Sequence, residues 1–189
     1  EVLAGLFFLS VGVFLLRDWS TPQDAPYKWI FAPGLVVLVL AWVFSARRLV
    51  DWFKQRITYP RTGYVSFRKD RSPRRRWTAA LMGAVIGAST PFLMHSIPSF
   101  KDLLPALNGL LLGLAFLLLA SKTMVARFHA LAIVSTIIGV SLTAARIGDL
   151  RGLSLYFALF GAAMALSGLA ALVVFLRRNK PAAEGPDEP

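Results

Sequence analysis

Six apolar stretches, separated by polar and charged connectors, dominate the pattern of the chain. They cover residues 2–16, 29–46, 77–97, 103–121, 128–145 and 152–176. A helix that spans a bilayer needs about 20 consecutive apolar residues, and most of these stretches approach that length. Strands of a membrane barrel would alternate apolar and polar residues, whereas these runs are continuous. The pattern therefore predicts an all-α fold, a polytopic bundle of about six transmembrane helices.

The first stretch, from Val2 to Leu16, is short for a spanning helix. We therefore expect it to continue before Glu1. A signal peptide is the alternative, but no basic n-region precedes the stretch and no A-x-A cleavage pattern follows it. At the other end, residues 179–189 combine prolines and acids without a large apolar side chain, so we expect a disordered tail.

Basic residues are divided unevenly between the connectors. With the N-terminus inside, the inner connectors hold 16 of the 21 Lys and Arg residues and the outer connectors hold 5. The inner connectors are 47–76, 122–127 and 177–180, and the outer ones are 17–28, 98–102 and 146–151. Because cytoplasmic connectors carry the excess of Lys and Arg, both termini are predicted to be cytoplasmic. The chain then divides into a transmembrane hairpin at 1–46, a basic cytoplasmic segment at 47–76, a four-helix bundle at 77–178 and the tail.

The composition agrees with a lipid environment. Hydrophobic residues make up 56% of the chain and charged residues 16%, so a soluble fold could not cover its apolar surface. The formal net charge is +11, but the charges lie between apolar stretches, which favours positive-inside connectors over a nucleic-acid surface. The absence of cysteine excludes disulfides, thiolate nucleophiles and Cys-based metal sites. His95 and His129 are predicted to face opposite sides, so they cannot form one site. The sequence also contains no catalytic or cofactor-binding motif, and we therefore expect no catalytic residues, no metal and no cofactor.

Small residues recur at helical spacing inside the spans. Close approach of helix backbones at small residues is a main source of packing energy between helices in lipid. We interpret the pattern as packing within one bundle, and the alternative is a homodimer interface. The candidate packing residues are Gly83, Gly87, Gly109, Gly113, Gly161 and Gly168.

Ionisable side chains are missing from the middle of every predicted span. Proton relays and ion-coupled carriers commonly use such groups, and acid–base catalysis needs positioned ones. Asn108, Ser135 and Thr143 are among the few polar residues there, and they would either bridge helices or line a permeation path. Arg146 and Asp149 are spaced for an ion pair, although a solvated helix end also explains them.

The basic segment at 47–76 holds eleven basic residues and two acids. From Arg47 to Arg56, apolar and charged residues are mixed, which predicts an amphipathic extension of the second helix at the membrane surface. Residues with high β propensity then flank a turn from Pro60 to Gly63, and this pattern predicts a short β-hairpin at 57–67. Because an isolated hairpin is marginally stable, it would need a supporting surface.

The stretch ITYPRTGYVSFR resembles a segment of an uncharacterised family of bacterial polytopic membrane proteins, which has a YPRxGYV-like sequence after a transmembrane helix. The resemblance rests on Tyr59, Pro60, Arg61, Gly63, Tyr64 and Val65. It implies a multi-pass protein of the bacterial inner membrane and supplies no catalytic residues, because the family has no assigned activity.

The basic segment is the part of the sequence that points to a function. Each Lys or Arg near an anionic leaflet contributes about 1 kcal/mol, so we expect the segment to bind anionic headgroups and, as an alternative, a protein partner or a second copy. The candidate interaction surface is Tyr59, Arg61, Gly63, Tyr64, Arg68, Arg74, Arg75 and Arg76. We favour a non-enzymatic membrane protein. The alternatives are a small permease or channel component and a membrane enzyme acting on a lipid phosphate.

Overall fold

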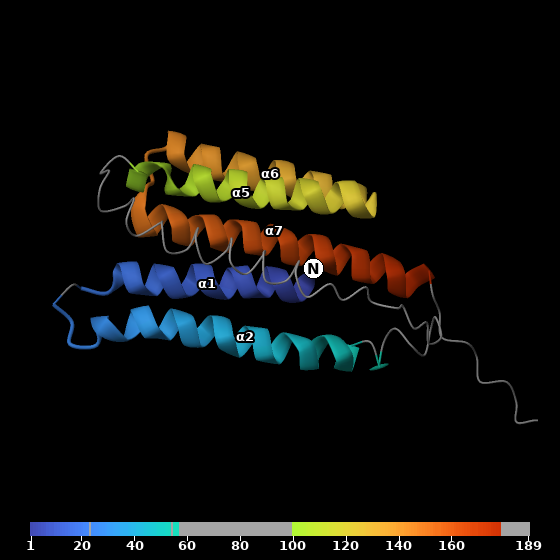
Figure 1. Cartoon of the computed structure of the whole chain (residues 1–189), viewed down its shortest axis with the longest axis horizontal. Helices are drawn as coiled ribbons and strands as arrows, with labels where there is room; N and C mark the ends of the chain where they lie inside the picture. Colours follow the sequence, from blue (N-terminus) through green and yellow to red (C-terminus); the bar gives the residue numbers. More distant parts are fainter. Residues whose placement is uncertain (23, 54, 57–99, 179–189) are drawn as a thin grey trace, which may run out of the picture.

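Five long helices and one short 3-10 turn make up the described part of the chain (Figure 1). The structure is a computed structural model that describes residues 1–22, 24–53, 55–56 and 100–178. In chain order the elements are α1 (Val2–Ser20), η1 (Lys28–Ile30), α2 (Phe31–Phe53), α5 (Phe100–Thr123), α6 (Ala126–Ala144) and α7 (Asp149–Arg178). Each of the five helices is long and apolar enough to cross a membrane.

The outward faces of these helices are apolar. Phe44, Leu110, Ile133 and Leu166 are 73%, 57%, 60% and 67% exposed, and many further leucines and valines are exposed beside them. Soluble monomers rarely expose contiguous apolar patches of this kind, whereas hydrocarbon is a favourable solvent for them. The described chain is therefore that of a multi-pass helical membrane protein.

The expected fold class is wrong in its β component. The described residues contain five such helices and no strand, and the hairpin expected at 57–67 and the span expected at 77–97 lie outside them. The second helix continues beyond the apolar stretch to Phe53, and residues 55–56 are also helical, in agreement with the extension predicted from Arg47 to Arg56. Tyr, Val and Thr predict a strand only where a neighbouring sheet can receive them, and this fold presents none in its described part.

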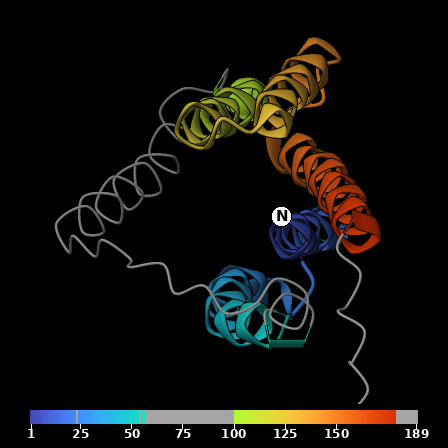
Figure 2. The same cartoon turned by 90° about the vertical axis from the view of Figure 1, so that its right-hand side faces the viewer.

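Two antiparallel helix pairs form the bundle. α1 packs along α7, and α5 packs along α6. Figure 2 shows α1 between α2 and α7, with the α5–α6 pair on the other side of α7. α2 is the least attached helix, since it has no buried residue and makes few contacts with α1.

Close backbone approach holds α1 to α7. A Cβ added at Gly12 would lie 2.5 Å from the Ala158 nitrogen and 2.8 Å from the Ser154 carbonyl oxygen. Farther along the interface, Gly161 lies equally close to the backbone of Leu9. Only glycine allows the two backbones this separation, and the many dispersion contacts it brings are what hold helices together in lipid.

A buried polar centre joins α5, α6 and α7. Ser135 Oγ donates to the Gly109 carbonyl at 2.9 Å, and the Tyr156 hydroxyl lies 2.7 Å from Ser135 Oγ and 3.3 Å from the Asn108 carbonyl. The Tyr156 hydroxyl donates to the Asn108 carbonyl, and either hydroxyl can donate in the bond between Ser135 and Tyr156. Both side chains are fully buried, and Tyr156 stacks on Phe160 with ring centroids 5.9 Å apart. The polar groups therefore satisfy one another inside an apolar core.

The end of α6 and the start of α7 each contain a residue with a positive φ. Arg146 ends α6 with a positive φ of 54°, and the amides of Ile147 and Arg146 donate to the carbonyls of Leu142 and Thr143 at 3.0 and 2.9 Å. This is the Schellman arrangement, in which glycine is the usual residue. Asp149, the first residue of α7, also has a positive φ, of 58°, so both residues lie at helix ends, which is the interpretation that the sequence favoured over an ion pair.

The C-terminus of α1 is capped by a lysine from the following connector. Lys28 Nζ donates to the carbonyls of Asp18 and Thr21 at 2.6 and 3.1 Å, and it pairs with the Asp18 carboxylate at 3.0 Å. A cation at this position also complements the negative end of the helix dipole.

Candidate interaction surface at the basic end

The helix ends gather into two groups, one at each end of the bundle (Figure 1). At one end, the Arg151 guanidinium lies 5.1 Å from the Trp19 ring, and Gly148 contacts Asp102. At the other end, Glu1 pairs with Arg127 at the start of α6. This second end, hereafter the basic end, collects the start of α1, the end of α2, the α5–α6 connection and the end of α7.

Charge separates the two ends. Among described residues, the basic end has seven Lys or Arg residues and two acids, whereas the opposite end has five and four. The first set is Arg47, Arg48, Arg56, Lys122, Arg127, Arg177 and Arg178 with Glu1 and Asp51; the second is Arg17, Lys28, Lys101, Arg146 and Arg151 with Asp18, Asp24, Asp102 and Asp149. The described residues of the connectors predicted to be cytoplasmic thus lie at the end with the larger excess of positive charge.

Aromatic rings accompany the arginines of the basic end. The Arg56 guanidinium lies 5.5 Å from the Trp52 ring, and the Arg127 guanidinium lies 5.6 Å from the Phe128 ring. In such a pair the aromatic ring stays in hydrocarbon while the guanidinium lies at the boundary with water. Such pairs are typical of helix ends at a membrane surface.

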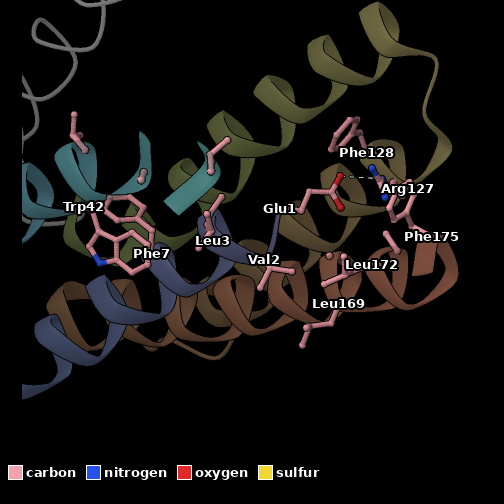
Figure 3. Close-up of a pocket in the computed structure, with 16 residues that line it drawn as sticks. Glu1, Val2, Leu3, Phe7, Trp42, Arg127, Phe128, Leu169, Leu172 and Phe175 are labelled. Atoms are coloured by element: carbon pink, nitrogen blue, oxygen red, sulfur yellow. Dashed lines mark ion pairs between the residues drawn. The ribbon is translucent and has the colours of Figure 1, made fainter. Parts of the chain in front are cut away.

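A groove opens beside these arginines. It has a volume of about 1020 Å³ and lies between α1, α2 and α7, with Arg127 and Phe128 of α6 at one edge. Its walls are almost entirely apolar, and Glu1 and Arg127 are its charged members (Figure 3). Small residues, including Ala4, Gly168 and Ala171, line it and leave it hollow.

The ion pair sits on the groove wall. Arg127 Nε lies 2.9 Å from Glu1 Oε1, and the Glu1 side chain is 12% exposed while that of Arg127 is 44% exposed. Neither Glu1 oxygen has a hydrogen bond of good geometry within the described structure, so the carboxylate depends on the charge of Arg127 for its stabilisation.

The residues predicted from sequence fall in three places. The whole predicted interaction surface, Tyr59, Arg61, Gly63, Tyr64, Arg68, Arg74, Arg75 and Arg76, lies outside the described residues, as do Gly83, Gly87 and His95. Gly109 and Gly113 lie against α6, and Gly161 and Gly168 lie against α1. Asn108 donates to its own helix at Leu104, and Thr143 accepts from the Ala106 amide, so these polar residues are engaged in packing.

Sequence reasoning missed the Glu1–Arg127 pair and the groove. Two signals were present: Arg127 begins an apolar run, and Gly5 and Gly12 of the first span are seven residues apart on one helix face. Neither signal reveals the partner helix, because Glu1 and Arg127 are far apart in sequence.

Comparisons with known proteins do not show a family for this chain. No family model matches the chain, and neither the curated proteins nor the solved structures contain a significant match. Among the described residues, no three His, Asp or Glu side chains come together as a metal site would require. Any functional assignment therefore rests on the chemistry of the basic end.

Proposed function

We propose that this protein is a non-enzymatic multi-pass membrane protein that binds anionic lipid headgroups through its basic end. In this proposal the basic end faces the cytoplasm, both termini are cytoplasmic, and the membrane is a bacterial inner membrane, which the resemblance of the YPRxGYV-like segment supports. The sequence that follows α2, residues 54–76, contains further basic residues.

The charge asymmetry between the two ends carries the proposal. The described residues give the basic end an excess of five positive charges and the opposite end an excess of one. Each Lys or Arg near an anionic leaflet contributes about 1 kcal/mol, and the attraction fades within a Debye length. A difference of this size favours anionic lipid at one end of the bundle only.

A lipid-enrichment measurement tests the proposal. The protein is reconstituted in phosphatidylcholine vesicles with a minority of phosphatidylglycerol, extracted with its surrounding lipid into polymer-bounded discs, and the lipid ratio is measured by mass spectrometry. The test variant changes Lys122, Arg177 and Arg178 to Gln. The control makes the same change in charge at the opposite end, with Arg17, Lys101 and Arg146 changed to Gln.

We expect the test variant to lose phosphatidylglycerol enrichment and the control variant to keep it. A further variant with Arg74, Arg75 and Arg76 changed to Gln should also lose enrichment. Equal enrichment in the wild-type protein and the test variant at low ionic strength would refute the proposal.

Cysteine labelling tests the orientation, and the native chain contains no cysteine to interfere. Ser121→Cys lies at the basic end and Asp24→Cys at the opposite end. In spheroplasts, a membrane-impermeant maleimide should label the second variant and spare the first. Labelling of Ser121→Cys from outside would reverse the proposed orientation.

Neither alternative function gains a specific observation. A permease would use Asn108, Ser135 and Thr143 to line a path, but in this structure they bond to helix backbones in packed contacts. An enzyme acting on a lipid phosphate would need a general acid or base beside the phosphate. At the groove, the one carboxylate is engaged with Arg127.

A further inference from the structure

We propose that the groove between α1, α2 and α7 holds one acyl chain of an anionic phospholipid, with the lipid phosphate bound at Arg127. This inference rests on the proposed function, because it assigns a defined seat to one of the anionic lipids drawn to the basic end. It goes further by distinguishing a bound lipid from the loosely attracted ones around the bundle.

The shape of the groove fits an extended chain. Figure 3 shows it running from Phe7 and Trp42, which are in edge contact with centroids 5.9 Å apart, to the Glu1–Arg127 pair. On α2 the lining extends from Trp42 to Val50, which corresponds to about 12 Å along the helix axis. The groove thus leads from the membrane surface toward the bilayer interior, as an acyl chain does.

The groove exists because α1 makes unequal contacts with its two neighbours. Glycines draw α1 and α7 together over the length of α1. α2, in contrast, contacts α1 through larger side chains, with Phe14 and Phe31 5.5 Å apart and Phe7 against Trp42. In Figure 1 the two helices diverge toward the basic end, where the groove opens.

The lining is suited to hydrocarbon. Leu3, Val43 and Leu172 are among the side chains that face the groove, and its volume of about 1020 Å³ is that of a large small-molecule site. Side chains around an unfilled hollow lose their dispersion contacts on one side, and these contacts are the main source of packing energy in lipid. An acyl chain restores them without bringing a polar group into the membrane.

The charges at the groove select the headgroup. Arg127 pairs with Glu1 through Nε, and the Arg127 side chain is 44% exposed, so its guanidinium is accessible to a ligand. Two parallel N–H donors match the oxygens of a phosphate. Lys122, Arg177 and Arg178 do not line the groove, but they lie at helix ends of the same basic end and supply the net positive charge that the neutralised pair lacks, which favours phosphatidylglycerol over phosphatidylcholine.

Quenching of Trp42 by brominated lipid tests the inference. Trp19, Trp29, Trp52 and Trp77 are changed to Phe, which leaves Trp42 on the groove wall as the only fluorophore of its kind. The protein is titrated with phosphatidylglycerol or phosphatidylcholine carrying bromine on the acyl chains. Ala171→Phe fills the groove, and Ala170→Phe is the matched control, because Ala170 is exposed on the same helix and does not line the groove.

We expect saturable quenching that prefers phosphatidylglycerol, is lost in Ala171→Phe and is kept in Ala170→Phe. Arg127→Gln should lower the preference about fivefold, the factor that corresponds to one basic residue at an anionic surface. Lys122→Gln, at the same end but outside the groove, should change it less. Ala46→Phe, which fills the groove from α2, replaces Ala171→Phe if that variant fails to fold.

Two results would overturn the inference. Quenching that is equal for both lipids and unchanged in the filled variants would mean that Trp42 meets only ordinary surrounding lipid. Absence of quenching by either lipid would mean that another part of the chain or another protein occupies the groove. In both results, enrichment of phosphatidylglycerol that depends on Lys122, Arg177 and Arg178 would leave the proposed function standing, and its loss would remove both proposals.

Discussion

Replacement of Gly12 by alanine should loosen the contact between α1 and α7. The added Cβ would lie 2.5 Å from the Ala158 nitrogen and 2.8 Å from the Ser154 carbonyl oxygen. Both atoms belong to the backbone of α7, so no side-chain rotation relieves the overlap. The helices have to separate by roughly 1 Å to bring these atoms to ordinary van der Waals contact.

The magnitude follows from two opposing terms. A radial gap of about 0.5–1 Å forfeits a quarter to a half of each dispersion well, and overpacking in well-packed cores typically costs about 1–3 kcal/mol. Alanine has a higher helix propensity than glycine, which returns up to about 1 kcal/mol. We therefore expect Gly12→Ala to lower the free energy of unfolding by about 1–2 kcal/mol.

Unfolding in mixed micelles, followed by tryptophan fluorescence as the fraction of denaturing detergent rises, measures this loss. Gly34→Ala in α2 is the matched control, because its added Cβ would meet only the tip of the Phe14 ring, at 3.0 Å. That control should be neutral or stabilising. If Gly12→Ala were as stable as the wild-type protein, the close backbone approach would not be the source of α1–α7 packing.

Three further substitutions probe the buried centre and the helix ends. Tyr156→Phe removes the hydroxyl that bonds to Ser135 and Asn108 and should destabilise the bundle by roughly 0.6–1.7 kcal/mol, the range found for hydrogen bonds between membrane helices. Arg146→Gly should stabilise it by about 0.5–1 kcal/mol, because glycine adopts the positive φ of 54° without steric cost. Lys28→Met removes the donor to the α1 carboxyl end and its ion pair with Asp18, and should cost about 1–2 kcal/mol. The same unfolding assay measures all three.

Each of these expectations has its own control. Tyr27→Phe removes a hydroxyl from a half-exposed tyrosine and should be neutral. Arg17→Gly introduces glycine inside a helix and should destabilise, opposite to Arg146→Gly. Lys101→Met removes an exposed lysine and should have little effect. Equal effects in a test variant and its control would contradict the role assigned to that side chain.

The bounds of a helix could be predicted from the sequence where charged residues flank an apolar stretch. The run at 128–145 corresponds to α6 at Ala126–Ala144, and the run at 152–176 corresponds to α7 at Asp149–Arg178. α2 continues past its apolar stretch to Phe53, as the mixed apolar and charged residues from Arg47 to Arg56 predicted. The β-hairpin was over-predicted from residue propensity, which is a weak guide without a neighbouring strand.

The candidate site could be predicted only in its charge. A surplus of arginine at one set of connectors is visible in the sequence, because it depends on counting residues between apolar runs. The groove depends on which helices meet. Glu1 and Arg127 are paired only because α1 lies beside α7 and the α5–α6 connection reaches the same end.

By itself, the sequence determined that the helices lie in hydrocarbon and that successive connectors lie on opposite sides of the membrane. Both follow from transfer free energies that add up locally along the chain. Only the tertiary structure decided that α1 pairs with α7, that Tyr156 and Ser135 satisfy one another, and that a groove remains beside α2. These outcomes depend on atomic fit between residues distant in sequence, and in lipid, where all faces are apolar, hydrophobicity cannot choose among partners.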